Sequence, residues 1–268
     1  MDVAGLVPGA SEGKGLGNQF LDDLRQADVF IHIVDSSGTT NEEGKPAVNH
    51  DPSKDILFLE NELNKWFYNI MMKAWKGFVK KIDQEEGGSF SEAISKQFSG
   101  LKVKEEHVKK VLSRLRLPEK SSKWSEDQIF WFASELRTES KPTIIAANKV
   151  DIEKARANYN FLKMRFPGLI IIPCSADSEL ALREAAKKGL INYIPGERSF
   201  EITGELSDEQ RGALSNIKES VLARIPEGTG VQEILNYAIF NFLKYIAVFP
   251  AGANKLADSK GRILPDCF

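Results

Sequence analysis

Three polar residues follow a short apolar segment near the middle of the chain. Asn148, Lys149 and Asp151 come directly after Thr143–Ala147, a run typical of a buried strand. A carboxylate at Asp151 can accept two neighbouring N–H groups as a charge-assisted pair. Guanine presents two such donors, at N1 and at its 2-amino group, whereas adenine has none there. We expect Asp151 to recognise a guanine ring, Lys149 to lay its aliphatic stem along the ring, and Asn148 to tie neighbouring loops together.

Two more loops carry groups suited to a nucleotide. Ser175 and Ala176 follow the next apolar segment, where small residues let backbone N–H groups approach a base carbonyl. Near the start of the chain, Asp2 and Gly5 form an Asp-x-x-Gly sequence. A carboxylate there can hold Mg²⁺ through water, and a glycine N–H can meet a γ-phosphate. The candidate nucleotide-binding residues are therefore Asn148, Lys149, Asp151, Ser175, Ala176, Asp2 and Gly5, and Asp2 is also the candidate metal ligand.

Each loop also has a plain structural explanation. Asp151 can be an acidic residue that the dipole at a helix N-terminus favours. Ser175–Ala176 fits an ordinary turn from strand to helix, and Asp2–Gly5 fits a turn at the end of a strand. Any one of the three is a weak indication of function, and the order in which they occur is what makes them informative.

Alternating strands and helices place these loops at one edge of a sheet. Apolar, β-branched runs predict buried strands at Val29–Val34, Thr143–Ala147 and Leu169–Pro173. Apolar residues spaced by threes and fours, together with capping and breaking residues, predict the helices. The predicted helices cover residues 18–26, 56–82, 104–117, 126–138, 152–166, 179–188, 207–224 and 231–246. This order is typical of an α/β fold with a parallel sheet and crossover helices, into which a helical insert is placed.

Length and composition narrow the class of protein. The 268 residues are enough for one to two domains, and 42% hydrophobic with 28% charged residues indicates a folded, soluble chain. The net charge of −2 gives no global reason to expect nucleic acid or membrane binding. The longest apolar runs are too short to span a bilayer, and the first residues do not form a signal peptide. Two distant cysteines exclude a disulfide scaffold or a cysteine-based zinc site, so we expect a cytoplasmic protein that does not bind membranes.

Taken in order, the three loops resemble those of a TRAFAC-class P-loop GTPase. The segment from Asp2 to Arg25 resembles switch II of the Obg and YchF group. The tail from Val248 to Pro265 resembles the start of a TGS domain, which follows the GTPase domain in YchF-type proteins. A helical insert ahead of N-K-x-D also fits that group. The chain therefore resembles the archaeal YchF-like branch of the Obg family.

The resemblance implies GTP and GDP as ligands and Mg²⁺ as the ion. It implies a nucleotide switch that hydrolyses GTP slowly in the full-length form and associates with the ribosome or with translation. It divides the chain into part of a GTPase domain (1–48), a helical insert (49–140), the rest of the GTPase domain (141–246) and a truncated TGS domain (247–268). The better-known YchF proteins have lost N-K-x-D and prefer ATP. Because this chain keeps Asn148, Lys149 and Asp151, we expect guanine.

Departures from the family pattern are equally informative. No G-x-x-x-x-G-K-[ST] sequence occurs, and Gly9-x-x-x-Gly13-Lys14 has the wrong spacing and follows Asp-x-x-Gly. We therefore expect an interior fragment that lacks the phosphate-binding loop and stops inside its TGS domain. Leu6 stands where Ras-like enzymes place a water-orienting Gln, and no other residue for that role is identified. Whether this chain by itself is an enzyme stays open.

A second function remains in competition with the nucleotide switch. The chain can be a non-catalytic module that binds RNA or protein through its helical insert and TGS region, with a vestigial nucleotide site. Residues 54–123 contain 15 Lys and Arg against 10 Asp and Glu, an excess that suits RNA but also suits a solvated helical surface. The aromatic residues of the insert are more simply the seam between helices than base-stacking groups.

Overall fold

The chain folds around a three-stranded parallel sheet. The computed structural model describes residues 24–82, 89–248 and 262. Its parallel strands are β1 (Phe30–Asp35), β2 (Thr143–Asn148) and β3 (Ile170–Pro173), in the order β1-β2-β3. The carboxyl ends of the three strands therefore lie along one edge of the sheet. The predicted α/β fold with a parallel sheet, crossover helices and a helical insert is confirmed.

The helices occur in the order that the sequence predicts, with one addition. The α-helices are α2 (Ser53–Ile82), α3 (Phe90–Gln97), α4 (Glu105–Arg114), α5 (Glu126–Ser140), α6 (Glu153–Arg165), α7 (Ala176–Lys187), α8 (Asp208–Ile217) and α9 (Val231–Asn236). Short 3-10 turns, 99–101 and 121–123, flank α4, and π-helical turns, 218–222 and 237–242, extend α8 and α9.

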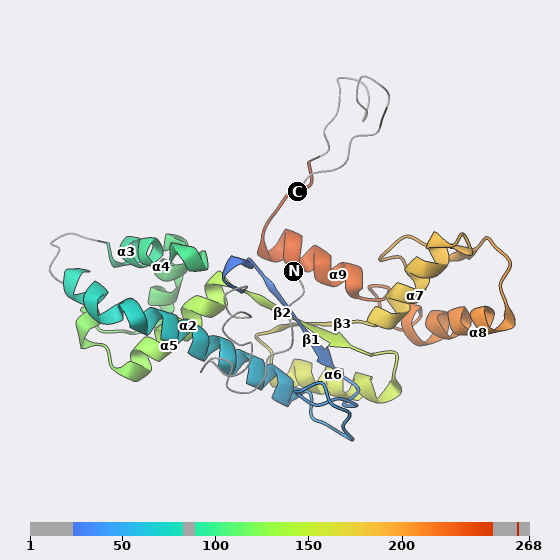
Figure 1. The fold of residues 1–268 in the computed structure, drawn as a ribbon, viewed down its shortest axis with the longest axis horizontal. Helices are drawn as coiled ribbons and strands as arrows, with labels where there is room; N and C mark the ends of the chain where they lie inside the picture. Colours follow the sequence, from blue (N-terminus) through green and yellow to red (C-terminus); the bar gives the residue numbers. More distant parts are fainter. Residues whose placement is uncertain (1–23, 83–88, 249–261, 263–268) are drawn as a thin grey trace.

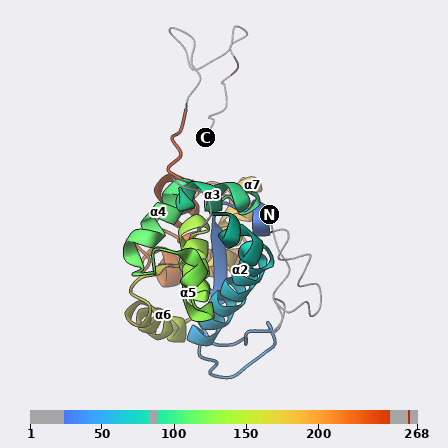
Figure 2. The same ribbon diagram turned by 90° about the vertical axis from the view of Figure 1, so that its left-hand side faces the viewer.

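Helices cover both faces of the sheet (Figure 1). Side chains alternate along β2, so Ile145 and Ile144 point to opposite faces. Ile145 packs with Leu162 of α6 and with the first turn of α2. Ile144 packs with Ile234 of α9 on the other face. The insert helices α2 to α5 extend from one end of the sheet, and α7 and α8 lie beyond the other end (Figures 1 and 2).

The helical insert has its own hydrophobic core. Trp66, Phe67 and Trp75 on α2 are buried against Phe132 of α5, and Phe78 packs against the same cluster. The interpretation of these aromatic residues as a seam between helices is confirmed. α5 starts with the predicted capping box: the Gln128 N–H donates to the Ser125 hydroxyl at 3.3 Å, and the Ser125 N–H donates to the Gln128 side chain at 2.9 Å.

The structure differs from the sequence-based elements in several places, among them the start of α2 at residue 53 and the end of α4 at residue 114. Helix α3 and the short antiparallel pair β4 (Ile191–Asn192) with β5 (Glu201–Ile202) were not predicted, because both are too short for a clear hydrophobic period. α7 begins at residue 176 and not at 179, since its first turn is polar and carries no apolar signal. The last helical segment ends at Phe242, four residues before the predicted end.

Some predictions fall on residues outside the described part of the chain. These are most of the helix predicted over 18–26, the Asp-x-x-Gly sequence, Leu6, and nearly all of the expected TGS segment. Among the helices of the described residues, none is both long and apolar enough to cross a membrane.

One exposed strand face leads to a prediction about solubility. Ile31 and Ile33 of β1, an outer strand of the described sheet, are 40% and 68% exposed. Apolar side chains on an outer strand favour pairing with other chains. We expect Ile33→Lys to raise the monomer fraction in light scattering after size exclusion, with an unfolding free energy changed by about 0.5 kcal/mol or less. A parent chain that is already monodisperse and melts cooperatively would contradict this.

The insert core leads to a second prediction, with a neighbouring residue as control. Phe132 is fully buried, whereas Trp131 is 66% exposed. We expect Phe132→Ala to lower the free energy of unfolding by about 3–5 kcal/mol because it leaves a cavity in the insert core. Trp131→Ala should change it by about 0.5 kcal/mol or less. Urea unfolding followed by circular dichroism measures both, and equal effects would show that the two positions are not packed as described.

Candidate nucleotide-binding site

The predicted site loops lie side by side at the carboxyl edge of the sheet. The strand register pairs Asp35 with Asn148 and Ala147 with Pro173, so the three strands end within one residue of the same level. Two backbone hydrogen bonds then continue the pairing past the strands. The Cys174 N–H donates to the Ala147 carbonyl at 2.9 Å, and the Val150 N–H donates to the Cys174 carbonyl at 3.3 Å.

Asn148 joins the two loops through its side chain. Its Oδ1 accepts the backbone N–H of Ala176 at 3.0 Å and lies 3.7 Å from the Cys174 thiol, which donates to it. An amide oxygen suits this position because it accepts from a backbone N–H without introducing charge. The loop-tying contact expected of Asn148 is therefore present.

Lys149 adopts a conformation that few residues other than glycine accept. Its φ is +65°, in the left-handed region, which costs free energy for a residue with a Cβ. Its Nζ lies 2.9 Å from Asp35 Oδ2 and donates to the Thr39 hydroxyl at 3.3 Å. The side chain therefore runs from the N-K-x-D loop to the end of β1. Strain of this kind is concentrated at functional sites.

Asp151 lies on the same rim as the Cys174–Ala176 turn. Among the described residues, its half-buried carboxylate has no hydrogen-bond or ion-pair partner. Burial raises the pKa of the Cys174 thiol to about 12, and the negative charge of Asp151 adds to this effect. The Val150 N–H donates to the Cys174 carbonyl at 3.3 Å, so the neighbouring residue Asp151 is held beside the turn. Cys174 is therefore a buried, protonated thiol and not a nucleophile.

Ser175 is turned inward. Its hydroxyl donates to Ser178 Oγ at 2.8 Å, and its N–H donates to the Thr229 carbonyl at 2.9 Å. Its side chain is buried, so it braces the turn and does not face the rim. The polar groups that the turn does present are the N–H groups in the first turn of α7, which have no partners inside the helix.

A distant segment supports the same turn, and sequence reasoning did not identify it. Glu179 is buried and accepts hydrogen bonds from the Thr229 hydroxyl at 2.6 Å and the Tyr193 hydroxyl at 2.8 Å. Burial raises the pKa of Glu179, but hydrogen bonds from Thr229, Arg183 and Tyr193 outweigh it and hold the pKa below its usual value. Gly230, with φ +79°, passes so close to the Pro173 carbonyl that a Cβ would lie 1.9 Å from its oxygen. Only glycine fits there.

The described residues include one group of side chains that could hold a metal ion, and it does not contain the predicted ligand. Asp2 and Gly5 fall outside the described residues, so the structure does not place the expected Mg²⁺ ligand. Within the described part, Glu42, His50 and Asp55 bring one ligand atom each within 4.8 Å of the others. His50 Nε2 is already hydrogen-bonded to Asp55 at 2.6 Å, so a structural contact accounts for this group.

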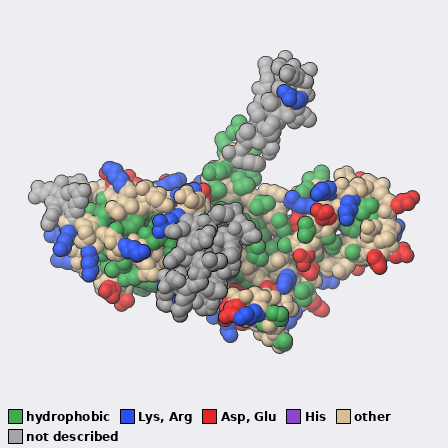
Figure 3. All heavy atoms as spheres, in the orientation of Figure 1, with side chains coloured by type: hydrophobic (Ala, Val, Ile, Leu, Met, Phe, Trp, Pro, Cys, Tyr) green, Lys and Arg blue, Asp and Glu red, His purple; other side chains and the backbone are tan. Residues whose placement is uncertain are grey.

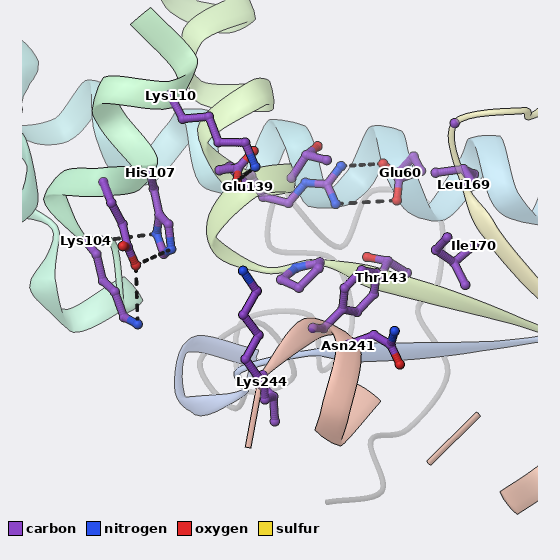
Figure 4. Close-up of a pocket in the computed structure, with 17 residues that line it drawn as sticks. Glu60, Lys104, His107, Lys110, Glu139, Thr143, Leu169, Ile170, Asn241 and Lys244 are labelled. Atoms are coloured by element: carbon purple, nitrogen blue, oxygen red, sulfur yellow. Dashed lines mark hydrogen bonds and ion pairs between the residues drawn. The ribbon is translucent and has the colours of Figure 1, made fainter. Parts of the chain in front are cut away.

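A separate cavity lies at the opposite, amino edge of the sheet (Figure 4). Its volume is about 690 Å³, and Thr143 and Ile170 at the starts of β2 and β3 contribute to its wall. Lys104 and Lys110, from the α4 region, and Lys244, after the last helix, lie around it. None of the predicted nucleotide-binding residues that the structure describes lines this cavity.

Comparison with known proteins finds relatives that are described as GTP-binding proteins. Residues 146–252 match a family described as "Obg-like GTPase YGR210-like, G4 motif-containing domain". The chain is 44% identical, over all of its length, to an uncharacterised GTP-binding protein of Methanocaldococcus jannaschii, of which it covers 67%. It is 39% identical over 73% of its length to an uncharacterised GTP-binding protein of Schizosaccharomyces pombe, of which it covers 48%.

A solved structure shows the same fold. The crystal structure of a GTP-binding protein from Pyrococcus horikoshii OT3 superimposes with a TM-score of 0.71 at 40% identity, over 92% of this chain and 66% of that one. The chain thus spans about two thirds of its archaeal relatives and about half of the yeast one. With this similarity along its whole length, the chain belongs to the Obg-like GTPase family.

Proposed function

We propose that this chain provides the base-recognition part of a GTP-binding nucleotide switch of the YchF type. The observation that carries the proposal is the contact between Asn148 Oδ1 and the Ala176 N–H. It holds the N-K-x-D loop and the Ser175–Ala176 turn together on one rim. Asp151, on that rim, has a carboxylate without a partner among the described residues, which is what a group awaiting a ligand requires.

Each residue then has a distinct task toward GTP or GDP. Asp151 accepts the N1–H and the 2-amino group of guanine as a bidentate pair. Adenine leaves that carboxylate desolvated and unpaired, so it is disfavoured. The stem of Lys149 covers the ring. The Ala176 N–H is bound to Asn148 Oδ1, so the N–H groups that follow it in the first turn of α7 meet the base carbonyl. Ser175 contributes by bracing the turn from inside.

The phosphate end of the ligand depends on residues outside the described part. We propose that Asp2 holds Mg²⁺ through water and that the Gly5 N–H meets the γ-phosphate, since carboxylate oxygen is a donor that Mg²⁺ prefers. The ion would neutralise phosphate charge during hydrolysis of GTP to GDP. Leu6 carries no group that can orient the attacking water, so another group must do so. A role in translation, at the ribosome and in the cytoplasm, completes the proposal.

The domain division expected from the sequence is retained as part of this proposal. Residues 1–48 and 141–246 form the GTPase domain, with β1 contributed by the first segment and β2 and β3 by the second. Residues 49–140 form the insert, whose separate core supports treating it as a unit. Residues 247–268 would begin a TGS domain.

Substitution of Asp151 tests base recognition. We expect Asp151→Asn to weaken GDP binding about tenfold or more, because an amide offers one acceptor in place of two and turns a donor toward the ring. Xanthosine diphosphate should gain affinity, since its C2 carbonyl can accept from that amide. Fluorescent nucleotide titration measures both ligands, on the chain itself and on a version with a phosphate-binding loop joined ahead of Met1.

Glu153→Gln is the matched control for that test. It removes one negative charge from the first turn of α6, two residues away. If Asp151 serves only the helix dipole, the two substitutions will act alike and leave the preference for guanine over xanthine unchanged. That result would end the base-recognition proposal.

RNA binding by the insert is the second candidate function. The observations that favour it are the basic residues of the insert, spread over the α2–α4 end of the molecule (Figure 3), and the three lysines around the cavity at the amino edge of the sheet. Phosphate contacts by lysines make binding weaken steeply with salt. In this function the base site is vestigial and nucleotide has no influence.

Substitution of the cavity lysines tests this alternative. We expect the double substitution Lys104→Ala and Lys244→Ala to weaken binding to structured RNA. The slope of log affinity against log salt concentration should also become shallower, by about one for each phosphate that a lysine no longer neutralises. Lys187→Ala, at the exposed end of α7, is the control and should leave the slope unchanged. RNA binding that is absent at low salt, or that depends on GTP, would exclude a nucleotide-independent RNA module.

A further inference from the structure

The carboxylate of Asp35 is surrounded by hydrogen-bond donors at the end of β1. Oδ1 accepts the Ser37 N–H at 2.9 Å and the Ser37 hydroxyl at 2.5 Å. Oδ2 accepts the hydroxyls of Thr39 at 2.8 Å and Thr40 at 2.7 Å, and the ammonium of Lys149 at 2.9 Å. The Asp35 side chain is 8% exposed, whereas that of Lys149 is 34% exposed. The Asp35 carboxylate is therefore held in place by its surroundings, and the more exposed Lys149 side chain is held by Asp35.

The donors keep this buried group charged. Burial raises the pKa of Asp35, but hydrogen bonds from Ser37, Lys149, Thr40 and Thr39 outweigh it and bring the pKa far below its usual value. An asparagine cannot replace this carboxylate. Its amide has a single acceptor oxygen and would direct its own N–H groups at some of the surrounding donors.

Nothing else in the described part of the chain holds the Lys149 side chain. Its backbone is in the left-handed region, and its two polar contacts are Asp35 and Thr39, which Asp35 also binds. The same carboxylate anchors the hydroxyls of the loop that follows β1, so this loop is held against the N-K-x-D loop. A free lysine would sample many rotamers and would have to be ordered when a ligand binds.

We infer that Asp35 is a positioning residue for nucleotide binding, which pins the stem of Lys149 over the place where the base lies. This inference rests on the proposed function, and it assigns different roles in nucleotide binding to Asp151 and Lys149. Asp151 reads the edge of the base and sets which base is chosen, whereas Lys149, held by Asp35, covers a face that all purines share. Asp35 therefore sets how tightly a nucleotide binds and leaves the choice of base to Asp151.

The first test needs no nucleotide. Acetylation of the intact chain, followed by mass spectrometry, gives the reaction rate of Lys149 relative to that of exposed Lys187. We expect Asp35→Asn to raise this ratio about fivefold or more, because the ammonium loses its charged partner. Thr40→Val is the matched control, since its hydroxyl contacts Asp35 but not Lys149, and it should leave the ratio unchanged. An unchanged ratio in Asp35→Asn would overturn the inference.

A second variant protects this test against loss of the fold. Thr39→Val removes an exposed hydroxyl that contacts both Asp35 and Lys149. We expect a smaller rise in Lys149 reactivity, with the melting temperature close to that of Thr40→Val. If Thr39→Val and Thr40→Val give the same Lys149 reactivity as the parent chain while Asp35→Asn fails to fold, Asp35 is a stability residue only and the inference is wrong.

The second test separates positioning from base reading. GDP and IDP differ by the 2-amino group, so the ratio of their affinities reports the contact with Asp151. We expect Asp35→Asn to weaken both about tenfold and to preserve their ratio. A changed ratio of GDP to IDP affinity in Asp35→Asn would overturn the role of Asp35. Unchanged affinities for GDP and IDP, in a variant in which Lys149 has become more reactive, would also overturn it. If Asp151→Asn leaves the ratio of GDP to IDP affinity unchanged, the proposal that Asp151 recognises the base is wrong. The acetylation rate of Lys149 then still decides whether Asp35 holds Lys149.

Discussion

The hydrogen bond from the Ala176 N–H to Asn148 Oδ1 is the contact on which the candidate site depends. It joins the loop after β2 to the turn after β3, two segments that are 28 residues apart in sequence. Because parallel strands end at one edge of a sheet, the fold brings both loops to the same rim. The sheet alone does not fix how the two loops are positioned relative to each other. The Asn148 side chain fixes the relative position of the two loops through an uncharged amide oxygen. The nearby Asp151 carboxylate takes no part in this contact and has no partner among the described residues.

Two further groups stabilise that arrangement from either side. On the β3 side, Glu179 and the segment around Gly230 hold the turn from within the protein. On the β1 side, Asp35 gathers the hydroxyls of the following loop and the Lys149 ammonium. Both are buried carboxylates kept ionised by several donors, which is what makes a buried charge tolerable. These contacts stabilise the rim, and the Asp151 carboxylate on it has no partner among the described residues.

The sheet edge and the helical insert are built around different hydrophobic clusters. The sheet edge carries the candidate site loops, and the insert has its own aromatic core with basic residues spread over its surface (Figure 3). The long helix α2 starts just after the loop that Asp35 organises and continues into the insert core. A series of contacts therefore runs from the Lys149 side chain through Asp35 to the loop that precedes α2.

The amino-acid sequence by itself determined the class of fold, the three strands, the long insert helix and the capping of α5, because these depend on local periodicity and on residues a few positions apart. It also indicated Asn148, Lys149 and Asp151 as a unit, since they follow a strand directly. Only the tertiary structure decided that Ser175 faces inward, that α7 starts at Ala176, and that Glu179, Gly230 and Asp35 brace the rim. Those contacts join segments that are distant in sequence, and their partners are set by how the strand ends and helices pack, which no local pattern encodes.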